Sequence, residues 1–574
     1  MAMAKAPYLE MGVVVSFSEI FNRRATIEDA RAMLAQYSRE SVLLVLAKLG
    51  AALRIWFRPD FEKDNGLARD VFKHAARAEA HTMPGRPNRL FFTRLGVLAT
   101  ARLALSACNN ADAPGVGQPA AAAQILLCCL MMNELTASSE PVTGLADLLV
   151  HQLANHNAMA HYDFRADLLR TLEMFERNRE LLAERPGLVD LEQEFIRAIG
   201  LSPRQFVGLC LVIGMPYRMI TAAALIRDDP TFFIDKNRFA NMKVSDGEWT
   251  ALFGTVARTA QELADFLPMQ GDRPLADTTV FQSWPIIRVA DGERYYCCDV
   301  AGLMDKTGRG LYWTLFAAAD TATKAKLGGT YGLAFEAYLH DCVRRTGFAG
   351  HAYMENPSFP NGDEVCDGIF VDGAALVLCE YKSSVLRADA KLSGRLNQLE
   401  PEIQKKFVTG DDDGRKGIAQ LRRSIERLLQ GEPIIGLPLR KWSVVLPVMI
   451  CLENAMLCPG MSGYLNGQFD RSIFRKQSFV RVAPLILVDV EHFEDLLPDI
   501  IKYGLATLLD DYYRAHVRTA GGRHDQLVPF RRKNIPFLDD KPEPPDEKET
   551  AFRRFFADLG TRLFDDAAEA TRDP

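Results

Sequence analysis

The stretch CDGIFVDGAALVLCEYKSS, residues 366–384, contains two apolar runs separated by a turn and bounded by acidic residues. Both runs are rich in strand-forming residues, and the Asp372-Gly373 pair between them is a strong signal for a tight hairpin. Residues that face each other in an antiparallel hairpin have a nearly constant index sum, so a turn at this pair places Asp367 near Glu380. Side chains alternate along a strand, so Lys382 points to the same face as Glu380. The pattern predicts a buried hairpin that ends in two carboxylates and one ammonium group.

The 574-residue chain is too long for a single core, and we expect about two to four domains. With 48% apolar and 25% charged residues, it has the composition of an ordinary soluble protein. Its formal net charge is only −6, so a nucleic-acid function requires a local basic patch. The eleven cysteines contain no CxxC pair, which favours reduced, buried thiols. Neither a secretory signal nor an apolar run of membrane-spanning length is visible, so we expect a cytoplasmic protein without a membrane partner.

The apolar patterns divide the chain into four parts. Residues 1–280 show helical spacing almost throughout, and we expect a helical region that serves recognition, a partner or oligomerisation. Residues 281–324 contain two short strand patterns and a connector. Residues 325–510 alternate helix and strand patterns, which predicts an α/β domain with a central mixed sheet between helices. Residues 511–574 form a tail with a proline-rich acidic linker and a short amphipathic helix.

Two helix patterns near the hairpin add polar groups to it. The segment YGLAFEAYLHDCV, which precedes the hairpin, places Glu336 among apolar residues. The segment GRKGIAQLRRSIERLL, which follows it, carries Gln420 between apolar positions and basic residues on either side: Lys416, Arg422 and Arg423. Between Tyr381 and Arg427 the sequence has eleven Lys or Arg against seven Asp or Glu, a local excess of four positive charges. A basic stripe of this kind suits contact with a phosphate backbone, although a solvated helix face with internal ion pairs would look the same.

Taken together, residues 325–510, about a third of the chain, resemble the PD-(D/E)XK superfamily of restriction-endonuclease-like nucleases. The matching residues are Glu336 in FEAYL, Asp367 in CDGIF, and the Glu-Tyr-Lys of LCEYK. The chain departs from the written motif at Cys366, where many members have proline. The resemblance implies a restriction-endonuclease-like α/β fold for this part of the chain.

The resemblance also implies roles for individual residues. Asp367 and Glu380 would bind Mg²⁺ or Mn²⁺, helped by the carbonyl group of Tyr381. Lys382 would orient or activate the attacking water, and Glu336 would be an additional acid that holds metal or water. Gln420 lies where several branches of the superfamily carry a glutamine, and with Lys416, Arg422 and Arg423 it would contact nucleic acid. Hard oxygen ligands and a nearby ammonium group suit phosphodiester hydrolysis on physical grounds as well.

We therefore predict a metal-dependent nuclease, with DNA favoured over RNA and an endonuclease over an exonuclease. A nuclease domain joined to a large helical region is typical of bacterial anti-phage or restriction proteins, an analogy at the level of fold. Three alternatives stay open: a non-catalytic nucleic-acid-binding or scaffold subunit of a larger complex; an enzyme on another α/β fold; and a purely structural Glu380–Lys382 ion pair. Protein partners or a homo-oligomer would form through the helical region.

Two weaker patterns lie outside this region. Three histidines recur at five-residue spacing, at positions His151, His156 and His161, which scatters them around a helix and argues against a zinc site. Trp56 and Phe57 lie between arginines and could stack on bases, but core packing is the simpler interpretation.

Overall fold

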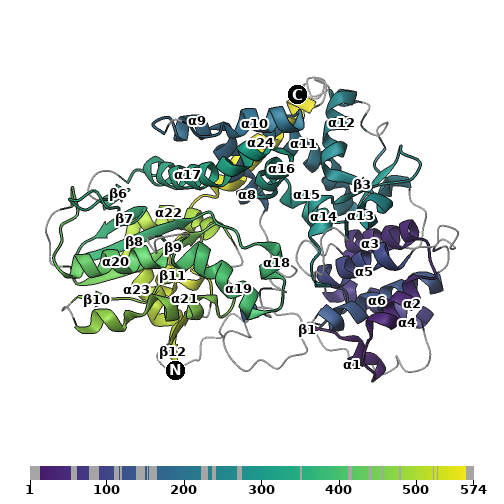
Figure 1. Cartoon of the computed structure of the whole chain (residues 1–574), viewed down its shortest axis with the longest axis horizontal. Helices are drawn as coiled ribbons and strands as arrows, with labels where there is room; N and C mark the ends of the chain where they lie inside the picture. Colours follow the sequence, from purple (N-terminus) through teal and green to yellow (C-terminus); the bar gives the residue numbers. More distant parts are fainter. Residues whose placement is uncertain are drawn as a thin grey trace.

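The computed structural model describes residues 13–53, 61–75, 89–108, 116, 119–136, 149–150, 153, 164–185, 187–220, 230–235, 239, 241–267, 274–348, 352–410, 416–437, 442–453, 456, 458–476, 480–520, 523–526 and 528–563. Trp56, Phe57 and the three spaced histidines lie outside these residues. Figure 1 shows a helical assembly at one end of the molecule, a six-stranded sheet at the other, and further helices between them. The chain is thus a multidomain α/β protein in which helices predominate.

The first helices form a bundle whose central members are almost entirely buried. Helices α3, α5 and α6 are apolar on nearly all sides, as expected of helices surrounded by others. Side-chain caps define two starts: Thr26 accepts from the Asp29 N–H, and Thr93 accepts from the Gly96 N–H. The bundle comprises α1 (Phe17–Phe21), α2 (Ile27–Leu34), α3 (Arg39–Leu53), α4 (Phe61–Ala75), α5 (Arg94–Ala107) and α6 (Pro119–Thr136), with a parallel pair of β1 (Val13–Val14) and β2 (Arg89–Leu90).

The middle of the chain adds a second group of helices around a small mixed sheet. Strand β4 (Ile286–Arg288) pairs parallel to β3 (Ala257–Thr259) and antiparallel to β5 (Tyr295–Cys297), so the two strand patterns after residue 281 do form a hairpin. The helices are α8 (Phe164–Glu176), α9 (Asn178–Leu181), α10 (Leu191–Ile199), α11 (Pro203–Gly214), α12 (Asp246–Val256), α13 (Ala260–Phe266), α14 (Thr279–Ser283), α15 (Val300–Asp305) and α16 (Gly310–Ala318).

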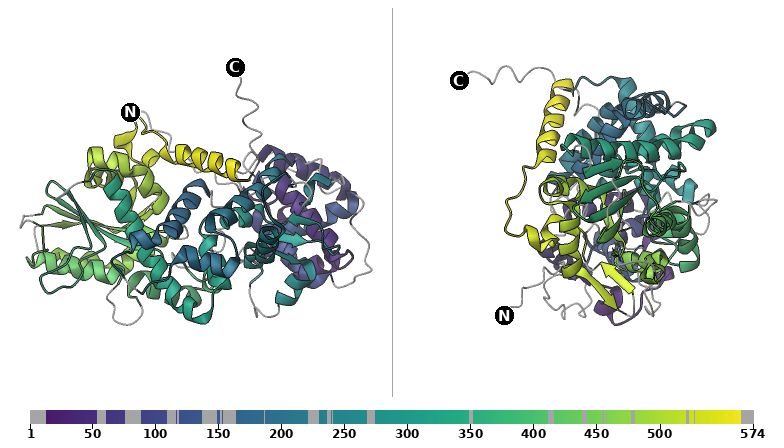
Figure 2. Two further views of the ribbon diagram at one scale, coloured as in Figure 1. Left: turned by 90° about the horizontal axis from the view of Figure 1, so that it is seen from above. Right: turned by 90° about the vertical axis from the view of Figure 1, so that its left-hand side faces the viewer.

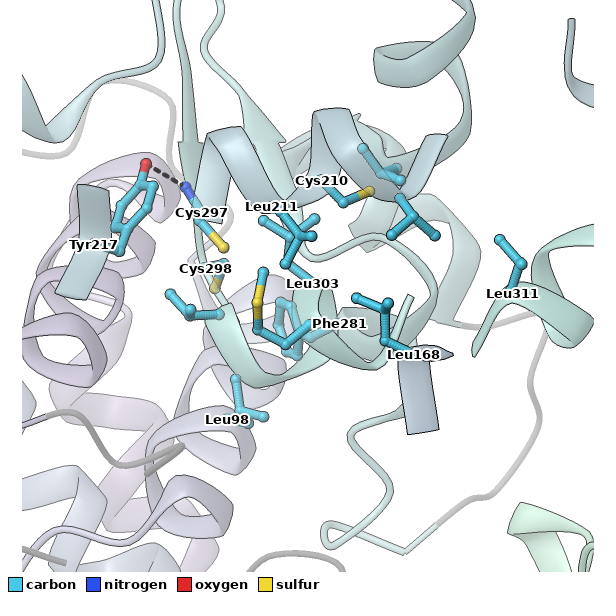
Figure 3. Close-up of a cluster of buried hydrophobic side chains, with 14 of the residues drawn as sticks. Leu98, Leu168, Cys210, Leu211, Tyr217, Phe281, Cys297, Cys298, Leu303 and Leu311 are labelled. Atoms are coloured by element: carbon cyan, nitrogen blue, oxygen red, sulfur yellow. Dashed lines mark hydrogen bonds between the residues drawn. The ribbon is translucent and has the colours of Figure 1, made fainter. Parts of the chain in front are cut away.

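Cysteines take part in this middle core as ordinary buried side chains. Figure 3 shows Cys210, Cys297 and Cys298 among leucines, with the Cys297 N–H donating to the Tyr217 hydroxyl at 2.9 Å. All eleven cysteines are buried free thiols, as the sequence predicted. Burial raises the pKa of the Cys210 thiol to about 12, so it stays protonated.

The large sheet is mixed. Its order is β10 (Arg481–Val482), β9 (Val444–Cys451), β8 (Ala375–Lys382), β7 (Gly368–Asp372) and β6 (Tyr353–Glu355), and β11 (Ile486–Asp489) also pairs with β9. Strand β7 runs antiparallel to both β6 and β8, whereas β9 is parallel to β8, β10 and β11. Parallel pairs need crossover connections, and helices in both the β8–β9 and the β9–β11 links supply them.

Helices cover both faces of this sheet. One face packs against α17 (Thr321–Arg345), α22 (Val490–Tyr503) and α23 (Leu505–His516) and shares a continuous core with the helical region. The other face packs against α19 (Leu396–Ile403), α20 (Ile418–Leu429) and α21 (Met461–Phe469), with the short α18 (Ala388–Lys391) beside them. The two faces alternate along β8, where Val377 and Cys379 face the first core and Leu376 and Leu378 the second.

The end of the chain returns to the helical region. After the hairpin of β12 (Val517–Ala520) and β13 (Arg523–Gln526), helix α24 (Glu547–Leu563) lies against α8, and Figure 2 shows it running along the outside of the molecule. The Phe552 ring meets Phe164 edge-on, and Glu549 pairs with Arg165 at 2.6 Å. The predicted C-terminal amphipathic helix therefore docks on a helix nearly 400 residues earlier in the sequence.

Buried charges join the helical region to the sheet. Arg170 on α8 pairs with Asp167 at 2.7 Å and with Glu494 on α22 at 2.5 Å, and all three side chains are almost fully buried. Burial raises the pKa of Glu494, but Arg170 and Lys548 outweigh this effect and lower it to about 2. Nearby, burial raises the pKa of Asp489 to about 6 against the opposing charges of Arg170 and Arg309.

Within the described residues, no single helix is long and apolar enough to cross a membrane; one bent pair, Leu191–Ile199 with Pro203–Tyr217, meets the criterion only in combination.

Candidate functional site

The β7–β8 hairpin has the predicted register. Asp372 pairs with Ala375 at the turn and Gly368 pairs with Cys379 at the open end, so Asp367 lies opposite Glu380 one position further on. The Tyr381 N–H donates a hydrogen bond to the Asp367 carboxylate, which fixes that carboxylate at the end of the ladder. The sequence pattern alone therefore located this part of the site.

Glu380 is the most enclosed of these groups, with 1% of its surface exposed. Its Oε1 atom accepts from Lys382 Nζ at 2.5 Å and from the Gly417 N–H at 3.1 Å. Its Oε2 atom is buried and has no hydrogen-bond partner among the described residues. A buried carboxylate oxygen without a partner is costly, so it marks a place where a cation or water belongs.

Gly417 aims the start of helix α20 at Glu380. Its φ of +63° favours glycine, and a Cβ atom there would lie only 2.3 Å from the Phe407 carbonyl oxygen. The N–H groups at the start of a helix carry partial positive charge and stabilise an anion. The predicted site included basic residues of this segment but not Gly417. A glycine directly before an amphipathic pattern could have indicated the start of a helix whose N–H groups are available to an anion.

Asp367 and Lys382 influence each other's ionisation through Glu380. Burial and the neighbouring Glu380 raise the pKa of Asp367 well above its usual range, and Lys382 opposes the shift only partly. Burial lowers the pKa of Lys382, but Glu380 and Asp367 outweigh this effect and raise it. Lys382 is therefore a charged ammonium at neutral pH, held between two acids.

Tyr381 points away from this cluster, as strand alternation requires. Its hydroxyl lies 2.8 Å from that of Tyr353, which lies 2.6 Å from Nδ1 of the buried His340. This hydrogen-bonded chain ties β8 and β6 to α17 on the opposite face of the sheet. Tyr381 thus contributes its backbone N–H to the site, whereas its side chain is structural.

Glu336 approaches from α17 without touching the hairpin carboxylates. Its Oε1 atom lies 3.2 Å from Arg185 Nη2 and 3.9 Å from Nε2 of His340. Burial raises the pKa of Glu336, but His340 and Arg185 outweigh this effect and lower it, so the group is ionised. No hydrogen bond between described residues links it to Asp367 or Glu380.

Glu364 is a fourth acid that sequence analysis missed. It lies three residues before Asp367 in an irregular segment and is exposed. Burial of part of the group and the charge of Glu380 raise the pKa of Glu364, and the charge of Glu336 adds to the shift. This mutual influence places all four acids in one electrostatic cluster.

The predicted nucleic-acid contacts are only partly gathered at the cluster. Lys416 is exposed and directly precedes Gly417, so it lies beside Glu380. Gln420 is half-buried on the first turn of α20, and Arg422 and Arg423 are exposed further along it. At the far end, Arg427 is held by Glu432 and Asp363 and lies over the Phe359 ring, so it serves the fold.

The oxygen donors of this cluster fit a hard divalent cation. Within the described part of the chain, no group of three or more His, Cys, Asp or Glu side chains converges as a ready-made metal cage. Mg²⁺ does not need one, because it commonly binds through one or two carboxylates and keeps several waters. Asp367 and the unpaired Oε2 of Glu380 would supply the carboxylates.

Searches against protein-family models, curated proteins and solved structures find no match for this chain. Its function is therefore inferred from the residues of the site.

Proposed function

We propose that the chain is a metal-dependent nuclease that hydrolyses phosphodiester bonds, with DNA as the favoured substrate, and that residues 325–510 form a restriction-endonuclease-like domain. The observation that carries this proposal is the convergence of Asp367, Glu380 and Lys382 on one face at the end of a hairpin, with a buried Glu380 oxygen left unpaired. Two acids and one amine on a rigid strand pair are the groups that such hydrolysis needs.

Each group has a role that follows from its position. Asp367 and Glu380 would hold Mg²⁺ or Mn²⁺, which when bound supplies Lewis-acid stabilisation of charge on the phosphate. Lys382 would release Glu380 and use its ammonium to orient the attacking water or a phosphate oxygen. The Gly417 N–H would keep Glu380 in place during that exchange. Hydrolysis adds the water oxygen to phosphorus, with the water's proton released to solvent, and breaks the bond to the leaving oxygen, which takes a proton from solvent.

The Glu380–Lys382 contact also favours one rival. The pair is closed at 2.5 Å, so it would equally stabilise the hairpin of a scaffold or nucleic-acid-binding subunit that never cuts. The cleavage assay described below distinguishes the enzyme from the scaffold. For either one, we propose a larger role in bacterial anti-phage defence or restriction.

The test incubates purified protein with supercoiled plasmid, single-stranded DNA and RNA, in Mg²⁺, Mn²⁺ or EDTA. We expect cutting that requires the metal and is abolished by Asp367→Ala and Lys382→Ala. Lys326→Ala, at an exposed position on α17, is the matched control and should cut like the wild type. Equal cutting by wild type and Lys382→Ala would refute the site, and binding without cutting in every condition would support the rival.

A further inference from the structure

The helical region reaches the site through the segment between α9 and α10. This segment is anchored on α17, because the Val189 N–H donates to Thr330 Oγ1 at 3.2 Å. The Asn178 side-chain amide donates to the Val189 carbonyl at 2.8 Å, which ties the segment to α9. Figure 1 shows α9 and α10 next to α17. Arg185 therefore approaches Glu336 from a fixed position.

Arg185 is an accessible cation in direct contact with one of the acids, Glu336. Its Nη2 atom contacts Glu336 Oε1 at 3.2 Å, yet 43% of its side chain is exposed, against 13% for Lys382. A guanidinium group has several N–H donors in one plane, so the contact with Glu336 leaves others directed to solvent. Such a group can bridge a carboxylate and a phosphate oxygen at the same time.

The net charge of the site favours an additional cation such as the Arg185 guanidinium. Counted at their formal charges, the four acids (Glu336, Glu364, Asp367 and Glu380) and Lys382 sum to −3, and one divalent cation reduces this sum to −1. A phosphodiester anion would still be repelled, because electrostatic complementarity governs the approach of a charged strand. Arg185 brings the sum to zero at the edge where solvent enters.

We propose that Arg185 binds a phosphate oxygen of the nucleic-acid strand next to the bond that is cut, so that the helical region completes the site. This inference rests on the proposed function. Arg185 is then a specificity and positioning residue supplied by the first half of the chain, which explains why the two halves share one continuous core on the α17 face of the sheet.

The test compares R185Q with R179Q, a matched control on α9 whose arginine is 80% exposed and pairs with Asp190 at 3.0 Å. Binding of a fluorescein-labelled DNA duplex and of its single strand is measured by anisotropy in Ca²⁺, and KM and kcat are measured in Mg²⁺. We expect R185Q to raise Kd and KM about tenfold with kcat nearly unchanged, since it removes a charge-assisted hydrogen bond. R179Q should stay within about twofold of wild type, and R185K should recover part of the affinity.

Two results would overturn the inference: equal behaviour of R185Q and R179Q, or faster cutting by R185Q, which would show that Arg185 restrains Glu336. Because the anisotropy assay measures DNA binding without cleavage, the proposal for Arg185 and the nuclease proposal can fail independently of each other. If the wild type never cuts but R185Q still weakens binding, the nuclease proposal fails and the role of Arg185 in binding phosphate stands.

Discussion

Asp367 lies directly across from Glu380 at the open end of the β7–β8 hairpin, and the two carboxylates share one face of the sheet. Burial and, after it, the charge of the almost completely buried Glu380 raise the pKa of Asp367, so one acid adds to the cost of ionising the other. A cation between them would remove this repulsion. The hairpin is therefore expected to be less stable without metal than with it.

Asp367→Asn should separate the repulsion between the two carboxylates from the stabilisation that a bound cation provides. The asparagine can still accept from the Tyr381 N–H, but it removes one of the two facing charges. In EDTA at neutral pH we expect the variant to melt about 1–3 °C above the wild type. Mn²⁺ should then raise the Tm of the wild type and leave that of the variant unchanged, as measured by differential scanning fluorimetry. An equal Mn²⁺ shift in both proteins would place the metal elsewhere.

Gly417→Ala tests the link between α20 and Glu380. The new Cβ atom would meet the Phe407 carbonyl at 2.3 Å in a conformation that disfavours alanine, so we expect a loss of about 2 kcal/mol or more in unfolding free energy and weaker metal binding. Gly431→Ala is the control, since its φ of +88° is equally unusual but the space around it is open. It should lose only about 1 kcal/mol and bind metal normally. Equal losses in the two variants would mean that the contact with Phe407 is unimportant.

The local part of the site was predictable from sequence because strand geometry is regular. An Asp-Gly turn between two apolar runs determines the register, and the register determines that Asp367 and Glu380 are neighbours and that Tyr381 points away. The mixed sheet between helices followed from the alternation of helix and strand patterns. The contacts of the hairpin join residues at most 14 positions apart.

The remainder depends on contacts that no spacing rule describes. Glu364 lies in an irregular segment, Gly417 meets Glu380 from 37 residues away, and Arg185 meets Glu336 from 151 residues away. Such pairs form only when separate elements pack, so their partners could not be identified from composition or periodicity. The same reason explains why α24 and its partner α8 could be recognised as helices but not as neighbours.

Arg170→Met should weaken the junction between the helical region and the sheet. The change removes the cation that Glu494 and Asp167 share but leaves Lys548 at 3.1 Å from Glu494 and Arg309 at 3.2 Å from Asp167, so we expect a cost of about 2 kcal/mol, below the roughly 3–5 kcal/mol of a fully uncompensated buried charge. Calorimetry should show a clearly lower Tm. Arg165→Met, which breaks the half-exposed pair with Glu549, is the control and should cost less than about 1 kcal/mol. An effect no larger than that of Arg165→Met would show that Lys548 and Arg309 alone compensate the two acids.

Asp489→Asn should give a stability difference that depends on pH. Burial raises the pKa of Asp489 to about 6 in the folded protein, so the folded state holds its proton more tightly than the unfolded chain does. The wild type should therefore lose stability relative to the variant as the pH rises from about 4 to about 7, by up to about 3 kcal/mol. The variant keeps an acceptor for the Glu491 N–H at the start of α22. Urea unfolding at pH 4 and at pH 8 measures the difference, and a difference independent of pH would contradict it.

The most direct test of the nuclease site compares the Mg²⁺-dependent DNA cleavage rates of the wild type and Glu380→Gln. The glutamine has the same shape and can still accept from Gly417 and Lys382, but it lacks the charge that a cation requires. We predict a rate at least about 100-fold lower in the variant, with a cooperative melting transition showing that the variant is folded. Equal rates in the two proteins would show that Glu380 does not hold the catalytic metal and would contradict the proposed site.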